Sequence, residues 1–401
     1  MKNGIRGHQM NDRVKEIEKY GKRVHLIFSD LDTREALQKI TSTTPEMIIT
    51  ELKNSGLRGR GGAGFPTGKK WELVAEQQSE IKYVVCNADE GEPGTFKDRE
   101  ILQKQADKVL LGMTACSRAV GAKQGYIYLR GEYDYLKTEL QNKINLFLKL
   151  LSEFNIDFTI ELRMGSGAYV CGEETSLLES LEGKRGEARN KPPYPVTAGF
   201  KGKPTVVNNV ETLVYCVHIL LNGAEIFFDM GTRSSHGAKV FCISGDTPVP
   251  GIYELELGMK LSDFVELFGD GDTKAVQIGG VSGYCVPRKE FKNTVIGFEG
   301  IPTGGSMMLF NSSRSMYNIL LNFLEFFAEE SCGQCTPCRV GCQQLLLGID
   351  KIKHGNEPST YLDVLRDMAT TMSISAKCGL GQSVANPFLS ITDYFREEII
   401  Y

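Results

Sequence analysis

Hydrophobic and polar positions alternate in blocks along the first half of the chain, and these blocks predict strands separated by helices. Residues 81–86 form a short apolar run typical of a buried strand, and residues 125–130 and 158–162 form two more. Apolar residues at helical spacing fill the intervals, over 98–119 and 133–154. Strands that alternate with helices of this length indicate βαβ units and a parallel sheet, so we predict an α/β fold for this part.

The pattern on either side of this block predicts further elements. Residues 24–28 predict a short strand, and a helix that begins after Thr44 ends at Gly56. Asn208 is predicted to cap another helix, with Glu211 three residues later as its capping-box partner. The stretch before this cap contains prolines that exclude a regular helix or a central strand and predict an ordered loop: Pro192, Pro193, Pro195 and Pro204.

Composition changes near residues 235 and 315, which divides the chain into three predicted domains. The middle part combines short strands with one amphipathic helix over 260–268, as expected for a small α+β unit. The last part has apolar residues at helical spacing throughout and predicts a helical bundle. The predicted domains are residues 1–235, 236–314 and 315–401.

Charge and hydropathy exclude two classes of partner. The chain has 46 Lys and Arg against 50 Asp and Glu, a net charge of −4, so no basic excess points to nucleic acid or to an anionic membrane surface. No run of about 18 uninterrupted apolar residues is present, and the charged N-terminus lacks the apolar segment of a secretory signal. We therefore expect a cytoplasmic protein with no nucleic-acid partner and no direct membrane insertion.

Cysteine spacing carries the strongest local signal. Eleven cysteines, an odd number, exclude a fully paired disulfide framework. Cys332, Cys335 and Cys338 form a C-x2-C-x2-C run, whose thiolates can ligate three corners of a [4Fe-4S] cluster. The fourth ligand is Cys342 or Cys378, and the absence of a second such run favours Cys378. A structural zinc site is the alternative, although zinc motifs usually pair two short Cys or His arms.

A glycine-rich run over residues 56–68 predicts an anion-binding loop. Residues 59–64 match G-x-G-x-x-G, but a helix precedes them where a Rossmann dinucleotide site requires a strand. Consecutive glycines still let backbone N–H groups converge on an anion, and Arg60 and Lys70 add positive charge. A plain mobile loop is the alternative.

Polar and acidic residues gather in loops that follow predicted strands, where ligands bind in parallel sheets. Carboxylates are suitable acceptors for ribose hydroxyls and for a flavin ring N–H. An ordinary solvated acidic surface is the alternative. The residues concerned are Asn87, Asp89, Glu90, Glu92, Glu173 and Glu174.

Four blocks of sequence, in this order, resemble the NADH-binding flavoprotein subunit of respiratory complex I and its relatives in NAD-linked hydrogenases and formate dehydrogenases. The blocks are residues 56–71, residues 86–99, residues 167–212 and residues 331–341 with Cys378. The resemblance implies a Rossmann-like domain that binds FMN and NADH, a small ubiquitin-like β-grasp domain, and a helical bundle that carries one [4Fe-4S] cluster. Residues 281–287 and 301–305, in the β-grasp stretch, match the family only loosely.

The resemblance also implies site residues. FMN would contact Gly59, Arg60, Gly61, Lys70, Asn87, Asp89, Glu90, Tyr169, Gly172, Glu173, Glu174, Asn208, Asn209 and Thr212, with Gly62 in the same loop. NADH would stack on Phe65 and use Gly64, Glu92, Glu174 and Lys191. The cluster ligands would be Cys332, Cys335, Cys338 and Cys378. No side chain is expected to act as a catalytic acid or base, because hydride passes between NADH and FMN, with Glu92 and Glu174 positioning NADH.

The implied activity is that of an NADH dehydrogenase (diaphorase) subunit. Hydride would pass between NAD(H) and FMN, and single electrons between FMN, the cluster and a partner. The expected partners are a thioredoxin-like [2Fe-2S] subunit, since the chain shows no such domain, and a further iron–sulfur or catalytic subunit of a hydrogenase, a formate dehydrogenase, a bifurcating enzyme or a complex I-like assembly. The alternative is a non-catalytic iron–sulfur carrier or ligand-sensing subunit that uses the β-grasp domain. Acids at the presumed ribose site favour NADH over NADPH.

Overall fold

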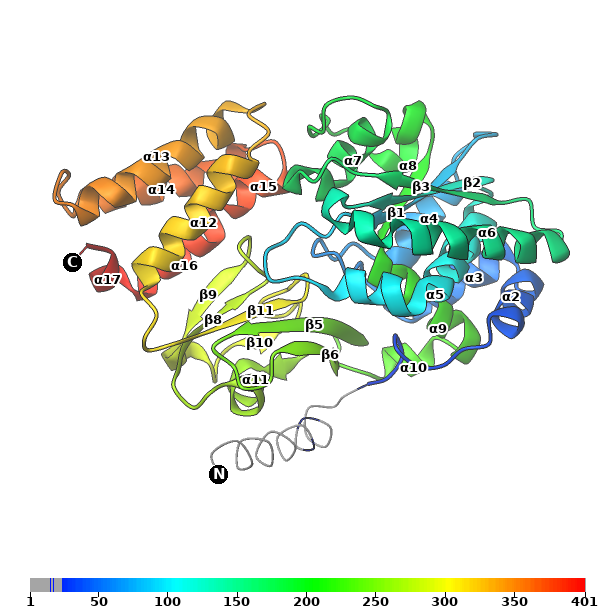
Figure 1. Cartoon of the computed structure of the whole chain (residues 1–401), viewed down its shortest axis with the longest axis horizontal. Coiled ribbons are helices and arrows are strands. Elements are labelled where there is room, and N and C mark those ends of the chain that lie inside the picture. Colours follow the sequence, from blue (N-terminus) through cyan, green and yellow to red (C-terminus); the bar gives the residue numbers. More distant parts are fainter. Residues whose placement is uncertain (1–14, 16, 18–23, 401) are drawn as a thin grey trace.

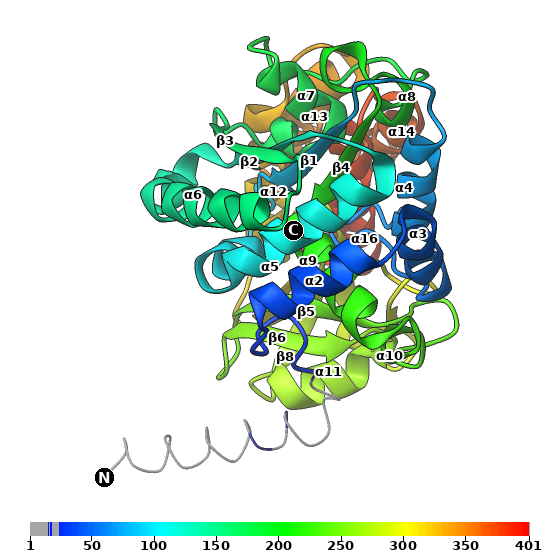
Figure 2. The same ribbon diagram turned by 90° about the vertical axis from the view of Figure 1, so that its right-hand side faces the viewer.

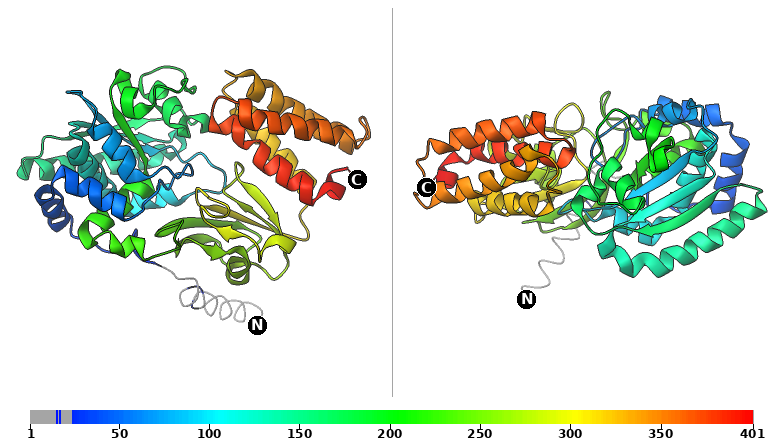
Figure 3. Two further views of the ribbon diagram at one scale, coloured as in Figure 1. Left: turned by 180° about the vertical axis from the view of Figure 1, so that it is seen from behind. Right: turned by 90° about the horizontal axis from the view of Figure 1, so that it is seen from above.

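Three units follow one another along the chain in the computed structural model, which describes residues 15, 17 and 24–400 (Figure 1). The other residues, which include the start of the predicted first domain and residue 401, lie outside the described part. The first unit is an α/β layer structure, the second a smaller mixed sheet with one helix, and the third a helical bundle. The bundle and the α/β unit lie at opposite ends of the molecule in the view from above (Figure 3).

The first unit is built on a four-stranded parallel sheet in the order β3-β2-β1-β4. Its strands are β1 (Tyr83–Ala88), β2 (Gln124–Leu129), β3 (Thr159–Met164) and β4 (Thr205–Asn209). Strand β1 lies in the interior of the sheet, and its consecutive residues Val84, Val85 and Cys86 are all buried. Burial on both faces explains the continuous apolar run in the sequence, and the predicted parallel sheet is confirmed.

Helices cover this sheet. The longer ones are α2 (Thr33–Ser42), α3 (Pro45–Asn54), α4 (Thr67–Ala75), α5 (Lys97–Val120), α6 (Lys137–Glu153) and α9 (Val210–Asn222). Helices α5 and α9 pack so closely at Gly112 that a β-carbon there would clash with the carbonyl of Leu213, so glycine permits this approach. Helix α2 lies across both of them (Figure 2). Shorter helical segments are η1 (Gly131–Leu136), η2 (Tyr169–Gly172), α7 (Glu174–Leu181), α8 (Pro195–Ala198), η3 (Phe200–Gly202) and α10 (Glu225–Phe228).

Three local predictions need correction. Residues 24–28 form no strand, although the Val24 N–H donates to the Glu254 carbonyl at 3.0 Å. Asn208 belongs to β4, and the cap of α9 is Asn209, whose side chain accepts the N–H of Glu211 at 3.0 Å. The carboxylate of Glu211 turns into the protein interior, so no capping box forms. The proline-rich stretch contains one helical turn, α8, which begins at Pro195 because proline is well suited to a first helical position.

The second unit has a five-stranded mixed sheet in the order β6-β5-β11-β8-β9. Its strands are β5 (Ala238–Gly245), β6 (Gly251–Glu256), β8 (Thr273–Ile278), β9 (Tyr284–Pro287) and β11 (Ser306–Asn311). Strands β5 and β11 pair in parallel and the other pairs are antiparallel. Helix α11 (Leu261–Phe268) buries Phe264 and Phe268 in the core of this unit. This is the expected β-grasp arrangement. The remaining short elements are β7 (Met259–Lys260), β10 (Val295–Ile296) and η4 (Arg288–Glu290).

The third unit is helical, as predicted. Its helices are α12 (Met316–Glu330), α13 (Thr336–Lys353), α14 (Tyr361–Ser375), α15 (Gly379–Ser383), α16 (Ala385–Tyr394) and α17 (Arg396–Ile400). Leu320, Leu345 and Leu365 are fully buried between the long helices. Within the described part of the chain, every helix falls short of the length or the apolar character that a membrane span requires.

Candidate functional site

A deep cleft lies at the carboxyl ends of β1 and β4, where ligands bind in parallel sheets. It has two connected parts, with about 1310 Å³ and about 1570 Å³ of empty space. We call the part lined by Asp89, Glu90 and Glu92 the acidic pocket, and the part lined by Gly59, Phe65 and Lys70 the loop pocket. The two parts share a wall made of Gly61, Ala63, Asn87, Gly172, Glu173, Asn209 and Gly379.

The structure brings almost all predicted cofactor-binding residues to this cleft. The acidic pocket is lined by Gly61, Gly62, Asn87, Asp89, Glu90, Glu92, Tyr169, Gly172, Glu173 and Asn209. The loop pocket adds Gly59, Gly64, Phe65, Lys70, Glu174, Lys191, Asn208 and Thr212. Only Arg60 of the predicted set lines neither part.

The glycine-rich loop forms one side of the cleft. The Gly59 N–H donates to the Phe65 carbonyl at 2.9 Å and closes the loop. Gly62 and Gly64 have φ values of +117° and +66°, which only glycine adopts readily. The N–H groups of Gly61, Gly62 and Ala63 donate to no other described residue. These free donors line the cleft, so the loop fits an anionic group such as a phosphate.

Arg60 does not contribute its charge to this loop. Its side chain is only 2% exposed, and the guanidinium donates to the carbonyls of His236 at 2.8 Å and Ala238 at 3.1 Å. Its own N–H donates to Thr212 Oγ1 at 2.9 Å. The prediction that Arg60 adds positive charge for an anion is therefore wrong. The residue fastens the loop to β5.

Two lysines supply positive charge to the loop pocket. Lys70 Nζ lies 3.0 Å from the Val207 carbonyl and 3.3 Å from Glu174 Oε2. Lys191 Nζ lies 2.7 Å from Glu173 Oε1 and 3.5 Å from Glu174 Oε1. Burial alone would raise the pKa of Glu173, but hydrogen bonds from Lys191 and Thr175 outweigh it and hold the pKa below its usual value. Glu173 is therefore a carboxylate at neutral pH, as a ribose acceptor requires.

The three acids that define the acidic pocket, Asp89, Glu90 and Glu92, differ in their partners. Glu90 accepts from the N–H groups of Asp98 and Arg99 at the start of α5, and from the Tyr133 hydroxyl at 2.9 Å. Glu90 therefore caps α5, and burial raises its pKa to about 7. Both oxygens of Asp89 are buried without a hydrogen bond among the described residues, and burial likewise raises its pKa to about 7. Asp89 is thus the acid whose acceptor capacity is still unused.

Glu92 is held from two sides. The Tyr169 hydroxyl donates to Glu92 Oε2 at 2.6 Å. From the β-grasp unit, Ser282 donates its hydroxyl to Oε2 at 2.6 Å and its N–H to Oε1 at 3.1 Å. Burial raises the pKa of Glu92, although these donors act in the opposite direction. Sequence reasoning missed Ser282, because nothing in its local sequence connects it with a loop 190 residues earlier.

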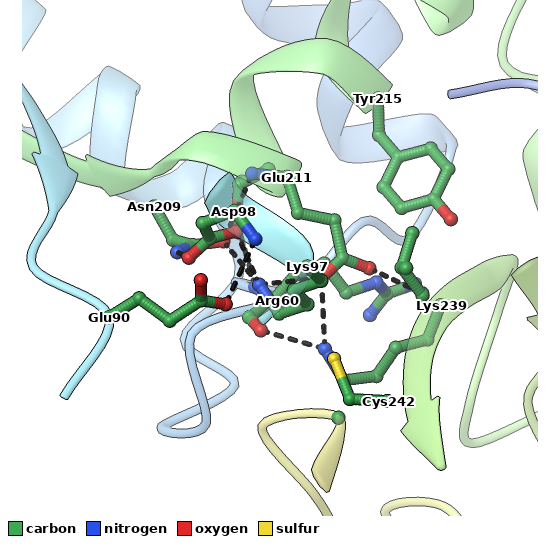
Figure 4. A network of polar contacts seen from close by, with 12 residues as sticks. Arg60, Glu90, Lys97, Asp98, Asn209, Glu211, Tyr215, Lys239 and Cys242 are labelled. Atoms are coloured by element: carbon green, nitrogen blue, oxygen red, sulfur yellow. Dashed lines mark hydrogen bonds and ion pairs between the residues drawn. The ribbon is translucent and has the colours of Figure 1, made fainter. Parts of the chain in front are cut away.

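Sequence reasoning also missed Lys97 and Asp98, which line the acidic pocket at the start of α5. Lys97 Nζ lies 2.6 Å from Asp98 Oδ1 and 3.0 Å from Glu211 Oε2 (Figure 4). The Asn209 amide donates to Asp98 Oδ2 at 2.6 Å, and Lys239 Nζ lies 3.1 Å from Glu211 Oε2. Lys97 and Asp98 could have been identified in the sequence as a pair of opposite charges directly before the apolar part of a helix.

Four cysteines surround a smaller pocket in the helical unit. Cys332, Cys335, Cys338 and Cys378 line about 280 Å³ of empty space between the start of α13 and the start of α15. No three Cys, His, Asp or Glu side chains of the described residues gather closely enough to hold a single metal ion. Four thiols that line one pocket can supply the four cysteine ligands of a [4Fe-4S] cluster. Cys342 is absent from the lining of this pocket.

The cysteine pocket adjoins the cleft. Val170 and Leu380 line both the cysteine pocket and the acidic pocket. Gly379, next to Cys378, lines both parts of the cleft. The segment that supplies the predicted fourth ligand is therefore also a wall of the predicted cofactor site.

Comparison with known proteins agrees with this geometry. Residues 52–218 match the Nuo51 FMN-binding domain, and residues 318–401 match the NADH-ubiquinone oxidoreductase-F iron-sulfur binding region. The chain is thus a flavin and iron–sulfur subunit of the NADH dehydrogenase class. It is 39% identical to an NADH-quinone oxidoreductase subunit of Rhizobium meliloti over 376 residues, covering 89% of each protein. The chain belongs to the family of NADH-binding flavoprotein subunits, and the resemblance seen in the sequence is confirmed.

Hydrogenase subunits are similar to the chain as well. It is 42% identical to the NAD-reducing hydrogenase HoxS subunit alpha of Cupriavidus necator, over 91% of this chain and 62% of that protein. It is 39% identical to the NADP-reducing hydrogenase subunit HndC of Solidesulfovibrio fructosivorans, over 91% of this chain and 77% of that protein. A solved NAD⁺-reducing [NiFe]-hydrogenase superposes with a TM-score of 0.88 at 41% identity, over 93% of this chain and 65% of that one. The chain thus spans less than two thirds of the length of two of these relatives.

Proposed function

We propose that the protein is the NADH dehydrogenase (diaphorase) subunit of a multisubunit redox complex. The observation that carries this proposal is the shared wall of Val170 and Leu380 between the cofactor cleft and the four-cysteine pocket. When bound in the cleft, FMN supplies hydride exchange with NAD(H) and transfer of single electrons. The protein binds, orients and separates the reactants, and no side chain acts as a general base.

The residues of the cleft have distinct proposed roles. The free N–H groups of the glycine-rich loop bind a phosphate, and Lys70 adds positive charge close to it. Asp89 offers its unused oxygens to a ring N–H. Glu92 and Glu174 orient the nucleotide through its hydroxyls, and the exposed ring of Phe65 provides a stacking surface at the cleft mouth.

The proposed cluster ligands are Cys332, Cys335, Cys338 and Cys378. All four line one pocket, whereas Cys342 lies behind Cys338 and outside the lining. A [4Fe-4S] cluster there would exchange single electrons with the cleft and with a partner subunit. We expect reconstituted Cys378→Ser to lose the cluster's EPR signal and its iron, and Cys171→Ser, a buried cysteine outside the pocket lining, to keep both.

The proposed nucleotide is NADH. Glu173 and Glu174 lie together in the loop pocket and would repel the 2′-phosphate of NADPH. Lys191 is already engaged by both carboxylates, which reduces its value as a phosphate ligand.

The proposed partners are a thioredoxin-like [2Fe-2S] subunit and a further iron–sulfur or catalytic subunit. Relatives that carry the names of hydrogenase subunits and of NADH-quinone oxidoreductase subunits support an assembly of this kind. The further subunit belongs to a hydrogenase, a formate dehydrogenase, a bifurcating enzyme or a complex I-like complex, and the assembly is cytoplasmic on its diaphorase side.

Anaerobic reconstitution tests the function. Purified protein loaded with FMN, iron and sulfide should bind flavin in a one-to-one ratio, and NADH should bleach the flavin absorbance faster than NADPH at equal concentration. Flavin binding without bleaching by either nucleotide would favour a non-catalytic carrier. Zinc in place of iron and sulfide would contradict the cluster assignment.

A further inference from the structure

Two side chains contact the sulfur of Cys338 without belonging to the proposed ligand set. Cys342 Sγ lies 3.8 Å from Cys338 Sγ, and Ser331 Oγ lies 3.2 Å from the same sulfur. Cys338 and Cys342 are four residues apart on α13, so one helical turn places them on the same face. Both neighbours are thus held by the fold itself: Ser331 at the end of α12, and Cys342 in the second turn of α13.

The chemistry of a cluster ligand determines the direction of these contacts. A ligating cysteine is a thiolate and carries no proton, so both neighbours can only donate to it. Ser331 Oγ also accepts the N–H of Gly333 at 3.3 Å, which leaves its proton free for Cys338. Cys342 is 1% exposed and packs among apolar residues of the bundle, so its thiol has no access to water.

Cys342 is poorly placed to be a ligand itself. The cysteine pocket is lined by four other cysteines, which already supply the usual ligand number of a [4Fe-4S] cluster. Cys342 is outside the lining of that pocket and is buried in the apolar cluster of the bundle. Its position is that of a donor to a ligand.

We propose that Ser331 and Cys342 are positioning residues that set the reduction potential of the cluster through hydrogen bonds to Cys338 Sγ. This inference rests on the proposed ligand set. The reduced cluster carries one more negative charge than the oxidised cluster, so a donor at its sulfur stabilises the reduced form more. One electron enters in this step, and no proton leaves Ser331 or Cys342.

The experiment is a potentiometric titration of the full chain, reconstituted anaerobically and followed by EPR. Cys342→Ala and Ser331→Ala should each retain wild-type iron, sulfide and signal shape. Each should lower the equilibrium constant of cluster reduction by roughly three- to tenfold, which moves the midpoint about 28 to 59 mV in the negative direction for a one-electron couple. The double variant should shift further than either single variant.

Two controls make the result specific. Cys342→Ser keeps a proton donor at the same place, so its midpoint should not move in the negative direction. Cys116→Ala removes a buried thiol from α5 in the first unit, and its midpoint should equal that of the wild type. If Cys342→Ala does not fold, as circular dichroism would show, Ser331→Ala and Cys342→Ser still test the inference.

The outcomes separate this inference from the ligand set. Unchanged midpoints in the alanine variants, or the same negative shift in Cys342→Ser as in Cys342→Ala, would overturn the hydrogen-bond role and leave the ligands as proposed. Loss of the cluster in a folded Cys342→Ala protein, together with its retention in Cys378→Ser, would instead make Cys342 the fourth ligand.

Discussion

Asp89 shows at the scale of one residue how a binding site differs from a protein core. Its carboxylate is buried, neither oxygen has a hydrogen-bond partner in the described part of the chain, and the Arg130 guanidinium stays 3.8 Å away. A buried carboxylate without donors favours its neutral form, and burial accordingly raises the pKa of Asp89 to about 7. Such an arrangement lowers the stability of the empty protein and suits a ligand that brings a donor.

The first prediction concerns how the free-energy cost of burying Asp89 depends on pH. The pKa of Asp89 rises from an ordinary value of 3.8 to about 7 on folding. The free energy of unfolding therefore decreases as the pH rises through that range, because the folded protein must then hold a buried carboxylate. In the FMN-free protein, Asp89→Asn should therefore raise the melting temperature at pH 8, by an amount equivalent to roughly 2–4 kcal/mol. The gain should be much smaller at pH 5. Differential scanning fluorimetry at both pH values measures it, and an equal gain at both would contradict the raised pKa.

Residue types and spacings predicted which side chains gather, but not where each one points. The cysteine spacing identified three residues that line one pocket with Cys378, and the acidic loop identified Asp89. Arg60 was misjudged because a glycine-rich loop with an arginine has the same composition whether the guanidinium faces a ligand or the interior. That choice depends on carbonyl groups more than 170 residues away in the chain.

At the scale of elements, buried charges join the starts of two helices to a strand. Glu211 at the start of α9 is fully buried and contacts Lys97 of α5 and Lys239 of β5 (Figure 4). It also accepts the Val240 N–H at 2.8 Å. Burial lowers the pKa of Lys239 to about 8, and Glu211 partly offsets that effect. The Glu211 carboxylate is thus shared by two buried ammonium groups, of which Lys97 also pairs with Asp98, and it connects the parallel sheet unit to the β-grasp unit.

The second prediction follows from this balance. Glu211→Gln removes the shared negative charge and leaves two lysines buried with less compensation. Breaking a buried ion pair from one side typically costs about 3–5 kcal/mol, so we expect a large loss in the free energy of unfolding, measured by urea denaturation. Glu139→Gln, on the exposed surface of α6, is the matched control and should change stability by less than about 0.5 kcal/mol. A similarly small change in the free energy of unfolding for both variants would show that Glu211 and its two lysine partners do not stabilise the fold.

Strands and helices with a strong hydrophobic periodicity could be predicted from sequence, whereas the residues at which they begin and end were harder to predict. The parallel strands and the long helices follow continuous apolar runs or helical spacing, which local burial dictates. The cap of α9 was placed at Asn208 and lies at Asn209, because two adjacent asparagines offer the same capping chemistry. Residues 24–28 have strand-like composition, but their hydrogen bonds with β6 all go to Glu254: the Val24 N–H donates to its carbonyl, and the N–H groups of Leu26 and Ile27 donate to its carboxylate, so no strand ladder forms.

At the scale of the whole molecule, the three units meet at one loop. Ser282 of the β-grasp unit donates twice to Glu92 of the first unit, and the Asn386 amide of α16 donates to the Ser282 carbonyl at 2.9 Å. A second contact, from the Tyr169 N–H to Glu330 Oε2 at 2.8 Å, joins the first unit to the end of α12. The acidic pocket is therefore completed by all three units. Sequence patterns describe each unit by itself, so they could not predict this junction.

The third prediction tests whether the junction acts on nucleotide binding. Ser282→Ala removes one of the donors that orient the Glu92 carboxylate, so the Kd for NADH should rise, at most roughly tenfold, the equivalent of the about 1.5 kcal/mol that one hydrogen bond to a charged group contributes. The Ser282 hydroxyl also lowers the pKa of Glu92, so its removal should raise that pKa. On acidification, the variant should therefore begin to lose affinity for NADH at a higher pH than the wild type. Titration of the FMN-loaded protein with NADH across a pH series measures both effects. Ser313→Ala, an exposed serine of the loop after β11, is the control and should match the wild type. An unchanged Kd with an unchanged pH profile would mean that the β-grasp unit covers the pocket without orienting Glu92.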